Sequence, residues 1–143
     1  SRRVPGVRMV DPAALLDLEV DLLVPASLGG LITVDLARRL RCRAVVGPAN
    51  NQLAEPAAGL VLAERGIAWA PDVVVNGGGA IYVVLREAGA ASHDEAMARV
   101  EGIGDRVREV LTAAAGSGRT PSEIVAGIAG QASSAIRQLP TLR

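Results

Sequence analysis

Short apolar runs alternate with amphipathic stretches through the first half of the chain. Each run has the length of a buried strand, and five runs are predicted as strands: Val7–Val10, Val20–Val24, Ala44–Val46, Ile67–Trp69 and Val73–Val75. Helix signals lie between them. Strands that alternate with helices favour an α/β fold built on a parallel sheet.

The helix signals are start and stop residues around the polar stretches. Asp11-Pro12 supplies an N-cap and a first-turn proline for a helix over Ala13–Leu18. Thr33 caps a predicted helix that runs to Leu40, and Pro56–Arg65 predicts a third helix that Gly66 ends.

Beyond residue 80 the pattern predicts helices only. Ser92 and Glu95 form a capping box, and the apolar positions after them recur three or four apart, which predicts one long helix up to Gly116–Gly118. Thr120 and Glu123 repeat the start signal for a final helix. We expect one domain over residues 1–143, with an α/β part over about 1–85 and a helical part over 86–143.

Three glycine- or amide-bearing segments follow predicted strands. They are Pro25–Ile32, Pro48–Asn51 and Asn76–Gly79. In an open parallel sheet, small molecules bind where the carboxyl ends of the strands open into loops, because the backbone there can approach a ligand closely. The sequence therefore predicts a ligand-binding rim formed by three loops.

Composition and charge narrow the class of partner. Trp69 and Tyr82 are the only aromatic residues among 143, although half of the chain is hydrophobic, so an all-β sandwich is disfavoured. The formal net charge is zero and no block of like charge occurs, which disfavours a nucleic-acid binder. A small-molecule partner fits better.

Candidate chemistry outside the three loops is sparse. Cys42 is a lone cysteine and is expected to be a small buried hydrophobe, and His93 is expected to be a surface residue at a helix start. No metal site is predicted. Because the sequence contains neither an apolar signal-peptide core nor a run long enough to cross a bilayer, we expect no membrane partner and a cytoplasmic location.

Three segments carry a family resemblance. They are Asp21–Gly30 (DLLVPASLGG), Val45–Leu53 (VVGPANNQL) and Arg65–Ile81 (RGIAWAPDVVVNGGGAI). In this order and spacing they resemble the cofactor domain of the glutamate/leucine/phenylalanine/valine dehydrogenases, over Asp21 to about Leu85. The Asn50–Leu53 segment is more similar to the branch that acts on apolar amino acids.

The resemblance implies a partial Rossmann-type parallel sheet flanked by helices and followed by C-terminal helices. It implies NAD-dependent, reversible oxidative deamination of an L-amino acid to a 2-oxo acid and ammonia, with NAD as cofactor. By similarity, the cofactor contacts come from Pro25, Ala26, Ser27, Asn50 and Asn76. The first three would border the nicotinamide ribose, and the two amides would orient the nicotinamide amide and the substrate's polar groups.

The substrate contacts that the resemblance implies are Asn50, Ala80 and Val83. Ala80 and Val83 would face the substrate side chain. Simpler interpretations remain open: Asn50 and Asn76 also suit helix caps or turns, and Ala80 and Val83 also suit core packing. Gly77–Gly79 would let the chain turn closely under the ligand.

Some elements of the family pattern are missing. Gly77, Ala26 and Trp69 replace the usual Ala, Cys and Tyr, and all fifteen basic residues are arginines, so no catalytic Lys is present. The G-x-G-x-x-G fingerprint and an acidic residue for the adenosine ribose are absent too. We therefore expect the C-terminal portion of a NAD(P)-binding domain that lacks its amino-terminal substrate domain, and no activity from this chain alone.

A second class of function stays open. The chain also fits a non-catalytic α/β nucleotide-binding or assembly module that kept the fold without the chemistry. The sequence leaves open which amino acid would be used, whether the cofactor is NAD or NADP, and whether the protein forms a homo-oligomer.

Overall fold

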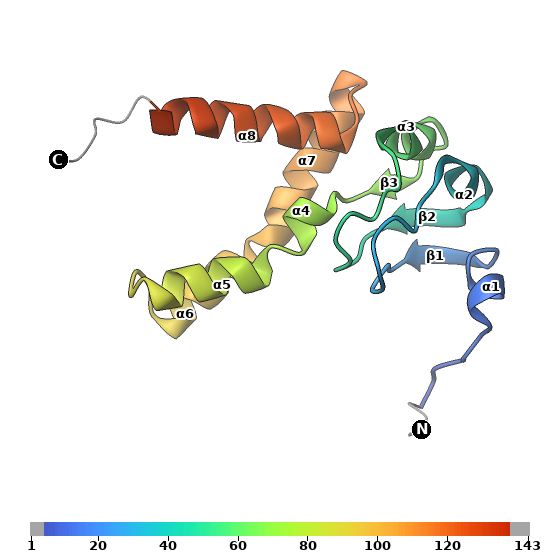
Figure 1. Ribbon diagram of the computed structural model, residues 1–143, viewed down its shortest axis with the longest axis horizontal. Helices are drawn as coiled ribbons and strands as arrows, with labels where there is room; N and C mark the ends of the chain where they lie inside the picture. The colour runs from blue at the N-terminus through green and yellow to red at the C-terminus, as the bar shows by residue number, and fades with distance from the viewer. Residues whose placement is uncertain (1–4, 138–143) are drawn as a thin grey trace.

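Three short parallel strands form the sheet of this protein (Figure 1). The computed structural model describes residues 5–137. In chain order the elements are α1 (Pro12–Leu15), β1 (Glu19–Leu23), α2 (Val34–Arg39), β2 (Arg41–Val45), α3 (Pro56–Glu64), β3 (Ala68–Trp69), α4 (Asp72–Val75), α5 (Gly78–Glu87), α6 (His93–Glu101), α7 (Ile103–Ser117) and α8 (Pro121–Arg137). The predicted α/β class with a parallel sheet and flanking helices is confirmed.

The core forms where cross-strand neighbours meet α2 and α3. Leu23 pairs with Val45, and Val45 pairs with Trp69, in register across the sheet, and all three side chains are buried. Leu36 of α2 and Leu62 of α3 pack in the same cluster. Burial of each such large side chain contributes roughly 1.5–3 kcal/mol, so apolar packing anchors the strands whose ends carry the loops.

The α2 helix begins as the sequence predicts. The Thr33 side chain accepts the backbone N–H of Leu36 at 3.1 Å. A second cap comes from a distant segment, because the Glu55 carboxylate accepts the backbone N–H of Val34 at 2.7 Å. Glu55 therefore joins the start of α2 to the start of α3.

Two predicted strands are wrong. Val7–Val10 forms no strand, and Val7 and Met9 are 58% and 86% exposed, because no neighbouring strand offers its backbone to them. The apolar run Val73–Val75 belongs to the short helix α4. Pro71 and Asp72 start this helix, and the N–H of Val74 bonds to the carbonyl of Pro71 at 3.0 Å. Proline before a first-turn acid favours a helix start over the strand preference of valine.

The helical part differs from prediction in one respect. The predicted long helix is two helices, α6 and α7, that break at Gly102. The final helix, α8, is confirmed. The last strand ends at Trp69, and the described elements after it are helices. The division of one domain near residue 85 stays a prediction.

Both predicted capping boxes are present. Glu95 accepts the backbone N–H of Ser92 at 2.7 Å, and Glu123 accepts that of Thr120 at 2.7 Å. These bonds hold the pKa of each carboxyl below its usual value, because they favour the ionised form. Each helix start is therefore capped most strongly when its glutamate is ionised, and this contribution fades as the pH falls through the lowered pKa.

Candidate functional site

The loops after β1 and β2 lie side by side at the carboxyl ends of the strands. Figure 1 shows the three arrowheads pointing the same way, toward the middle of the molecule. We call residues 24–33 the first loop, residues 46–55 the second loop and residues 70–77 the third segment. The ladder between β1 and β2 continues into the loops, since the N–H of Val46 bonds to the carbonyl of Leu23 at 3.1 Å.

Backbone hydrogen bonds join the first loop to the second along their length. Ala49 donates to the carbonyl of Pro25 at 3.1 Å, and Gly30 donates to the carbonyl of Asn51 at 2.7 Å. Ile32 then donates to the carbonyl of Gln52 at 2.9 Å. Because each bond fixes backbone on both sides, the two loops form one continuous platform.

Two glycines allow these loops to approach so closely. A Cβ at Gly47 would collide with the Pro25 carbonyl oxygen and lie 2.7 Å from its nitrogen. A Cβ at Gly29 would lie 2.5 Å from the Asn50 carbonyl oxygen. Such distances are too short for a real side chain, so glycine at 29 and 47 is required by contact between loops.

The second loop is joined to the third segment by two polar contacts. Asn76 Nδ2 donates to Asn50 Oδ1 at 2.5 Å, and the Asp72 carboxylate accepts the backbone N–H of Asn51 at 2.8 Å. Asn51 has a φ of 50°, which is uncommon for a residue with a side chain. We call Asn50 and Asn76 the amide pair.

The buried Gln52 side chain joins the second loop to the core. The Gln52 side chain is fully buried; its Nε2 donates to the Gly47 carbonyl at 2.6 Å, and its Oε1 accepts from Trp69 Nε1 at 3.1 Å. Buried polar groups persist where each finds a partner, and both ends of this amide are satisfied. A buried hydrogen bond, shielded from water, therefore connects the second loop to β3.

Sequence reasoning missed Gln52 and Asp72 as site-forming residues. Gln52 had a signal, because a buried tryptophan N–H needs an acceptor and Trp69 ends a predicted strand. Asp72 had none. Its importance depends on Asn51, 21 residues earlier in the chain, lying within reach of its carboxylate.

The predicted cofactor residues lie together on the platform and its neighbouring segment. Pro25 is buried beneath the second loop, whereas Ala26 and Ser27 are exposed. The structure brings Asn50 and Asn76 into direct contact. Their binding roles stay predictions.

Asn76–Gly79 does not form the predicted glycine loop. Asn76 ends α4, and Gly78 and Gly79 already belong to α5. Gly77 has a right-handed φ of −68°, so none of these glycines serves a turn that needs positive φ. A Cβ at Gly78 would lie 3.1 Å from Val100 Cγ1, which indicates that this glycine lets α6 pack closely against α5.

The two predicted substrate residues are exposed on α5. Ala80 and Val83 lie three residues apart, so they share part of one helix face, and neither is a core residue in the described structure. Ala80 also lines a hollow of about 830 Å³ with apolar residues of α4–α7, such as Val84 and Ile103. Val83 does not line this hollow. Their contact with a substrate stays a prediction.

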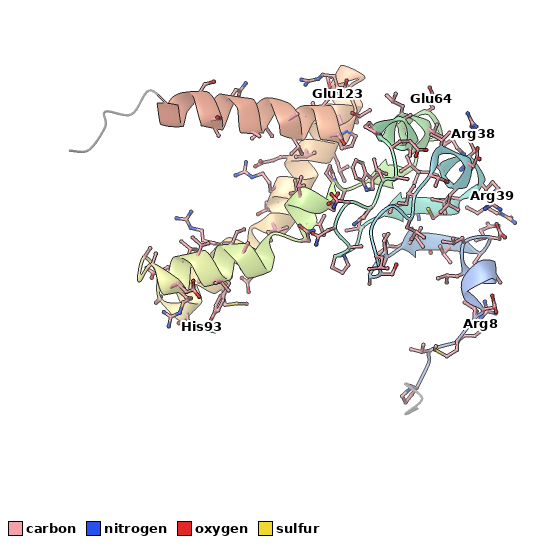
Figure 2. All side chains as sticks on the ribbon, in the orientation of Figure 1. Arg8, Arg38, Arg39, Glu64, His93 and Glu123 are labelled. Carbon is pink, nitrogen blue, oxygen red and sulfur yellow. The ribbon has the colours of Figure 1, made fainter. Side chains whose placement is uncertain are left out.

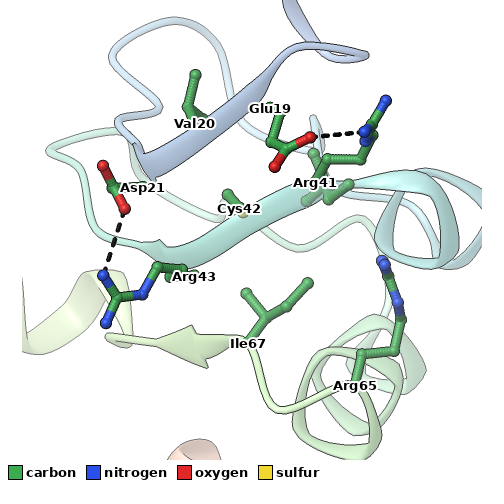
Figure 3. Close-up of a pocket in the computed structure, with 9 residues that line it drawn as sticks. Glu19, Val20, Asp21, Arg41, Cys42, Arg43, Arg65 and Ile67 are labelled. Atoms are coloured by element: carbon green, nitrogen blue, oxygen red, sulfur yellow. Dashed lines mark hydrogen bonds and ion pairs between the residues drawn. The ribbon is translucent and has the colours of Figure 1, made fainter.

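Another hollow lies at the opposite, amino-terminal ends of the strands. Figure 3 shows it between two ion pairs, Glu19–Arg41 and Asp21–Arg43. Cys42 lines it and is half-buried, and burial raises the pKa of its thiol against the lowering effect of the Arg65 guanidinium. All four ion-paired side chains are well exposed, so each pair contributes about 0–1 kcal/mol.

His93 lies far from the amide pair. Figure 2 labels it at the end of the α5–α6 hairpin that is remote from the sheet. It is exposed, as predicted, and its Nδ1 lies 3.0 Å from the Tyr82 hydroxyl. Among the described residues, no His, Cys, Asp or Glu cluster of metal-binding size occurs. In the same part of the chain, no helix has the length and apolar character to cross a membrane.

Comparisons with known proteins identify the family to which this chain is similar. The family described as Glutamate/Leucine/Phenylalanine/Valine dehydrogenase matches residues 2–123. The leucine dehydrogenase of Thermoactinomyces intermedius is 40% identical over 121 residues, which are 85% of this chain and 32% of that protein. The valine dehydrogenase of Streptomyces coelicolor is 36% identical over 135 residues, which cover 94% of this chain and 37% of the relative.

Solved structures give the same result. The L-tryptophan dehydrogenase of Nostoc punctiforme superposes with a TM-score of 0.82 and 31% identity over 88% of this chain and 38% of its own. The hetero-hexameric glutamate dehydrogenase of Thermus thermophilus gives a TM-score of 0.64 and 27% identity over 85% and 30% of the two chains. The chain thus spans about a third of the length of the curated relatives it matches.

The Gln52–Trp69 bond generates a stability prediction. In Gln52→Leu the Trp69 N–H and the Gly47 carbonyl lose their partner, and in Trp69→Phe the Gln52 oxygen loses its donor. Each single variant should lower the free energy of unfolding by roughly 1–3 kcal/mol, the cost of leaving a buried polar group unpaired. Urea unfolding followed by circular dichroism measures this quantity without relying on the tryptophan.

The double variant is the control for this prediction. If the two side chains act through their hydrogen bond, the double variant should cost less than the sum of the singles by about 0.5–3 kcal/mol. Strictly additive losses would mean that the two side chains stabilise the fold separately.

Proposed function

The chain belongs to the glutamate/leucine/phenylalanine/valine dehydrogenase family, and we propose that it forms the nicotinamide-facing part of the cofactor site of an NAD-dependent L-amino acid dehydrogenase. Its relatives place it in the leucine/phenylalanine/valine branch. The reaction would be the reversible oxidative deamination of an apolar L-amino acid to a 2-oxo acid and ammonia. NAD, when bound, accepts the hydride that leaves the α-carbon.

The amide pair is the observation that carries this proposal. Because Asn50 Oδ1 and Asn76 Nδ2 bond to each other, the pair has a free donor at Asn50 Nδ2 and a free acceptor at Asn76 Oδ1 among the described residues. A carboxamide, such as that of nicotinamide, offers the complementary acceptor and donor. The ammonium and carboxylate of an amino acid match the same two groups, so the pair suits both ligands.

The first loop offers further hydrogen-bond donors for the cofactor. The backbone N–H groups of Ala26 and Ser27 bond to no other described residue, and both residues are exposed beside the platform. Free N–H groups on a fixed loop can donate to ribose oxygens, while the absence of bulk at Ala26 allows close approach. These residues would therefore bind and orient, and they carry no group that exchanges protons in the reaction.

We propose that the proton chemistry comes from outside this chain. Deamination needs a base for the ammonium proton and for the water that attacks the imine carbon, and the amide pair is neither acidic nor basic near neutral pH. The sequence contains no lysine. We therefore propose that the active enzyme combines this chain with a substrate-binding portion, which fits the greater length of its relatives.

The proposed preference for an apolar amino acid is supported by two residues of α5. Ala80 and Val83 are a small and a medium-sized apolar residue, and both are exposed on α5, the helix that begins two residues after Asn76. The named activities of the relatives, leucine, phenylalanine and valine dehydrogenase, agree with an apolar substrate. NAD as the cofactor and a cytoplasmic location stay predictions, and the choice between NAD and NADP and the formation of a homo-oligomer stay open.

Activity should appear only when the proposed substrate-binding portion is supplied. We expect the isolated chain to give no NADH absorbance at 340 nm with NAD and L-leucine, L-valine or L-phenylalanine. A chimera that joins the amino-terminal part of the Thermoactinomyces leucine dehydrogenase to this chain, at the start of the matched region, should turn over. Turnover by the isolated chain would contradict the proposal, and a folded but inert chimera would favour the non-catalytic module.

Removal of one amide should slow the chimera. Asn76→Ala is expected to lower kcat by ~10² or more, the scale seen when a positioned polar group near reacting atoms is lost. Gln131→Ala removes an exposed amide from α8 and is the matched control, with no change expected. An unchanged kcat in Asn76→Ala would reduce Asn76 to a residue that ends α4.

A further inference from the structure

Asp72 forms hydrogen bonds with both segments that carry the amide pair. Its carboxylate oxygen Oδ2 accepts the backbone N–H of Asn51 at 2.8 Å, next in the chain to Asn50. Its backbone carbonyl accepts the N–H of Asn76 at 2.9 Å. Asp72 is 8% exposed, so these bonds are largely shielded from water. One residue therefore links the segments that bear the two amides.

Asn51 is held from both sides in an uncommon conformation. Its N–H is bound by Asp72, and its carbonyl accepts the N–H of Gly30 from the first loop at 2.7 Å. With φ at 50°, this residue has a left-handed backbone conformation, and the direction of the preceding Asn50 depends on it. Among the described residues, the Asp72 carboxylate is the one acceptor of the Asn51 N–H, so its loss leaves that N–H without a partner.

We propose that Asp72 is a positioning residue, whose carboxylate fixes the turn at Asn51 and so keeps Asn50 Oδ1 within reach of Asn76 Nδ2. The consequence for catalysis rests on the proposed function, whereas the geometric part does not. A charged acceptor suits this task, because hydrogen bonds to ionised groups are stronger and shorter than neutral ones.

Glu55 provides a matched comparison within the same loop. Its carboxylate also accepts a backbone N–H across 21 residues, that of Val34, at 2.7 Å. It lies four residues after Asn51 but caps α2, and among the described residues it forms no hydrogen bond with the amide pair. Loss of the Glu55 bond should therefore destabilise the fold without disturbing the pair, whereas loss of the Asp72 bond should do both.

Nuclear magnetic resonance on the 143-residue chain tests the geometric part directly. In Asp72→Ala, the amide of Asn51 should exchange with solvent about tenfold faster or more, as expected for a lost hydrogen bond. The side-chain NH₂ signals of Asn50 and Asn76 should shift toward those of free asparagine. Asp72→Asn retains an acceptor of the same shape and should restore most of both signals, and Glu55→Ala should leave them unchanged.

A second variant keeps the test decisive if Asp72→Ala fails to fold. Asp72→Leu fills the same space without an acceptor and should reproduce the signals of Asp72→Ala. Unchanged amide-pair signals in either folded variant would overturn the proposal. If both variants unfold while Asp72→Asn folds, Asp72 is a folding residue and the positioning role is also overturned.

Kinetics in the chimera separate this inference from the proposed function. Asp72→Ala should lower kcat about tenfold or more, and Asp72→Asn should recover most of it, while Glu55→Ala leaves kcat unchanged. If the resonance signals respond as expected but neither Asp72→Ala nor Asn76→Ala changes kcat, the positioning geometry stands and the proposed function fails. If only the Asn76 variant is slow, the positioning role fails and the function stands.

Discussion

The site depends on the backbone pairing of the first and second loops. Three bonds, from Ala49 to Pro25, from Gly30 to Asn51 and from Ile32 to Gln52, extend the parallel ladder beyond the ends of β1 and β2. Loops that follow parallel strands are ordinarily the variable and mobile parts of an α/β fold. Here hydrogen bonds join the two loops to each other, so we expect the platform to open together with the sheet and not as a separate mobile loop.

Two kinds of residue make that pairing workable. Small residues bring the backbones within bonding distance, since a side chain at Gly29 or Gly47 would collide with the opposite loop. Polar side chains then bond to backbone groups that the pairing leaves without a partner. Gln52 donates to the Gly47 carbonyl on the buried side, and Asp72 accepts the N–H of Asn51. The second donor and acceptor of the amide pair have no partner among the described residues, and they are the groups that we propose for a ligand.

The sequence predicted the parallel α/β class, the caps at Thr33, Ser92 and Thr120, and the approach of the asparagine segments to each other. These features depend on local signals or on the rule that parallel strands end on one side. It failed at Val73–Val75, where the strand preference of valine was overridden by the helix start at Asp72. It also failed for Asp72, because a partner 21 residues earlier in the chain leaves no mark in the local pattern, and for Gln52, whose signal was the need of the Trp69 N–H for an acceptor.

Native-state hydrogen exchange of the loop amides tests the central claim most directly. The account predicts that the amides of Gly30, Ile32 and Ala49 exchange within about tenfold of the amide of Ala70, which bonds to Val45 in the sheet, since all would open in one cooperative unit. Exchange of the three loop amides at the rates of an unprotected loop, while Ala70 stays protected, would contradict it.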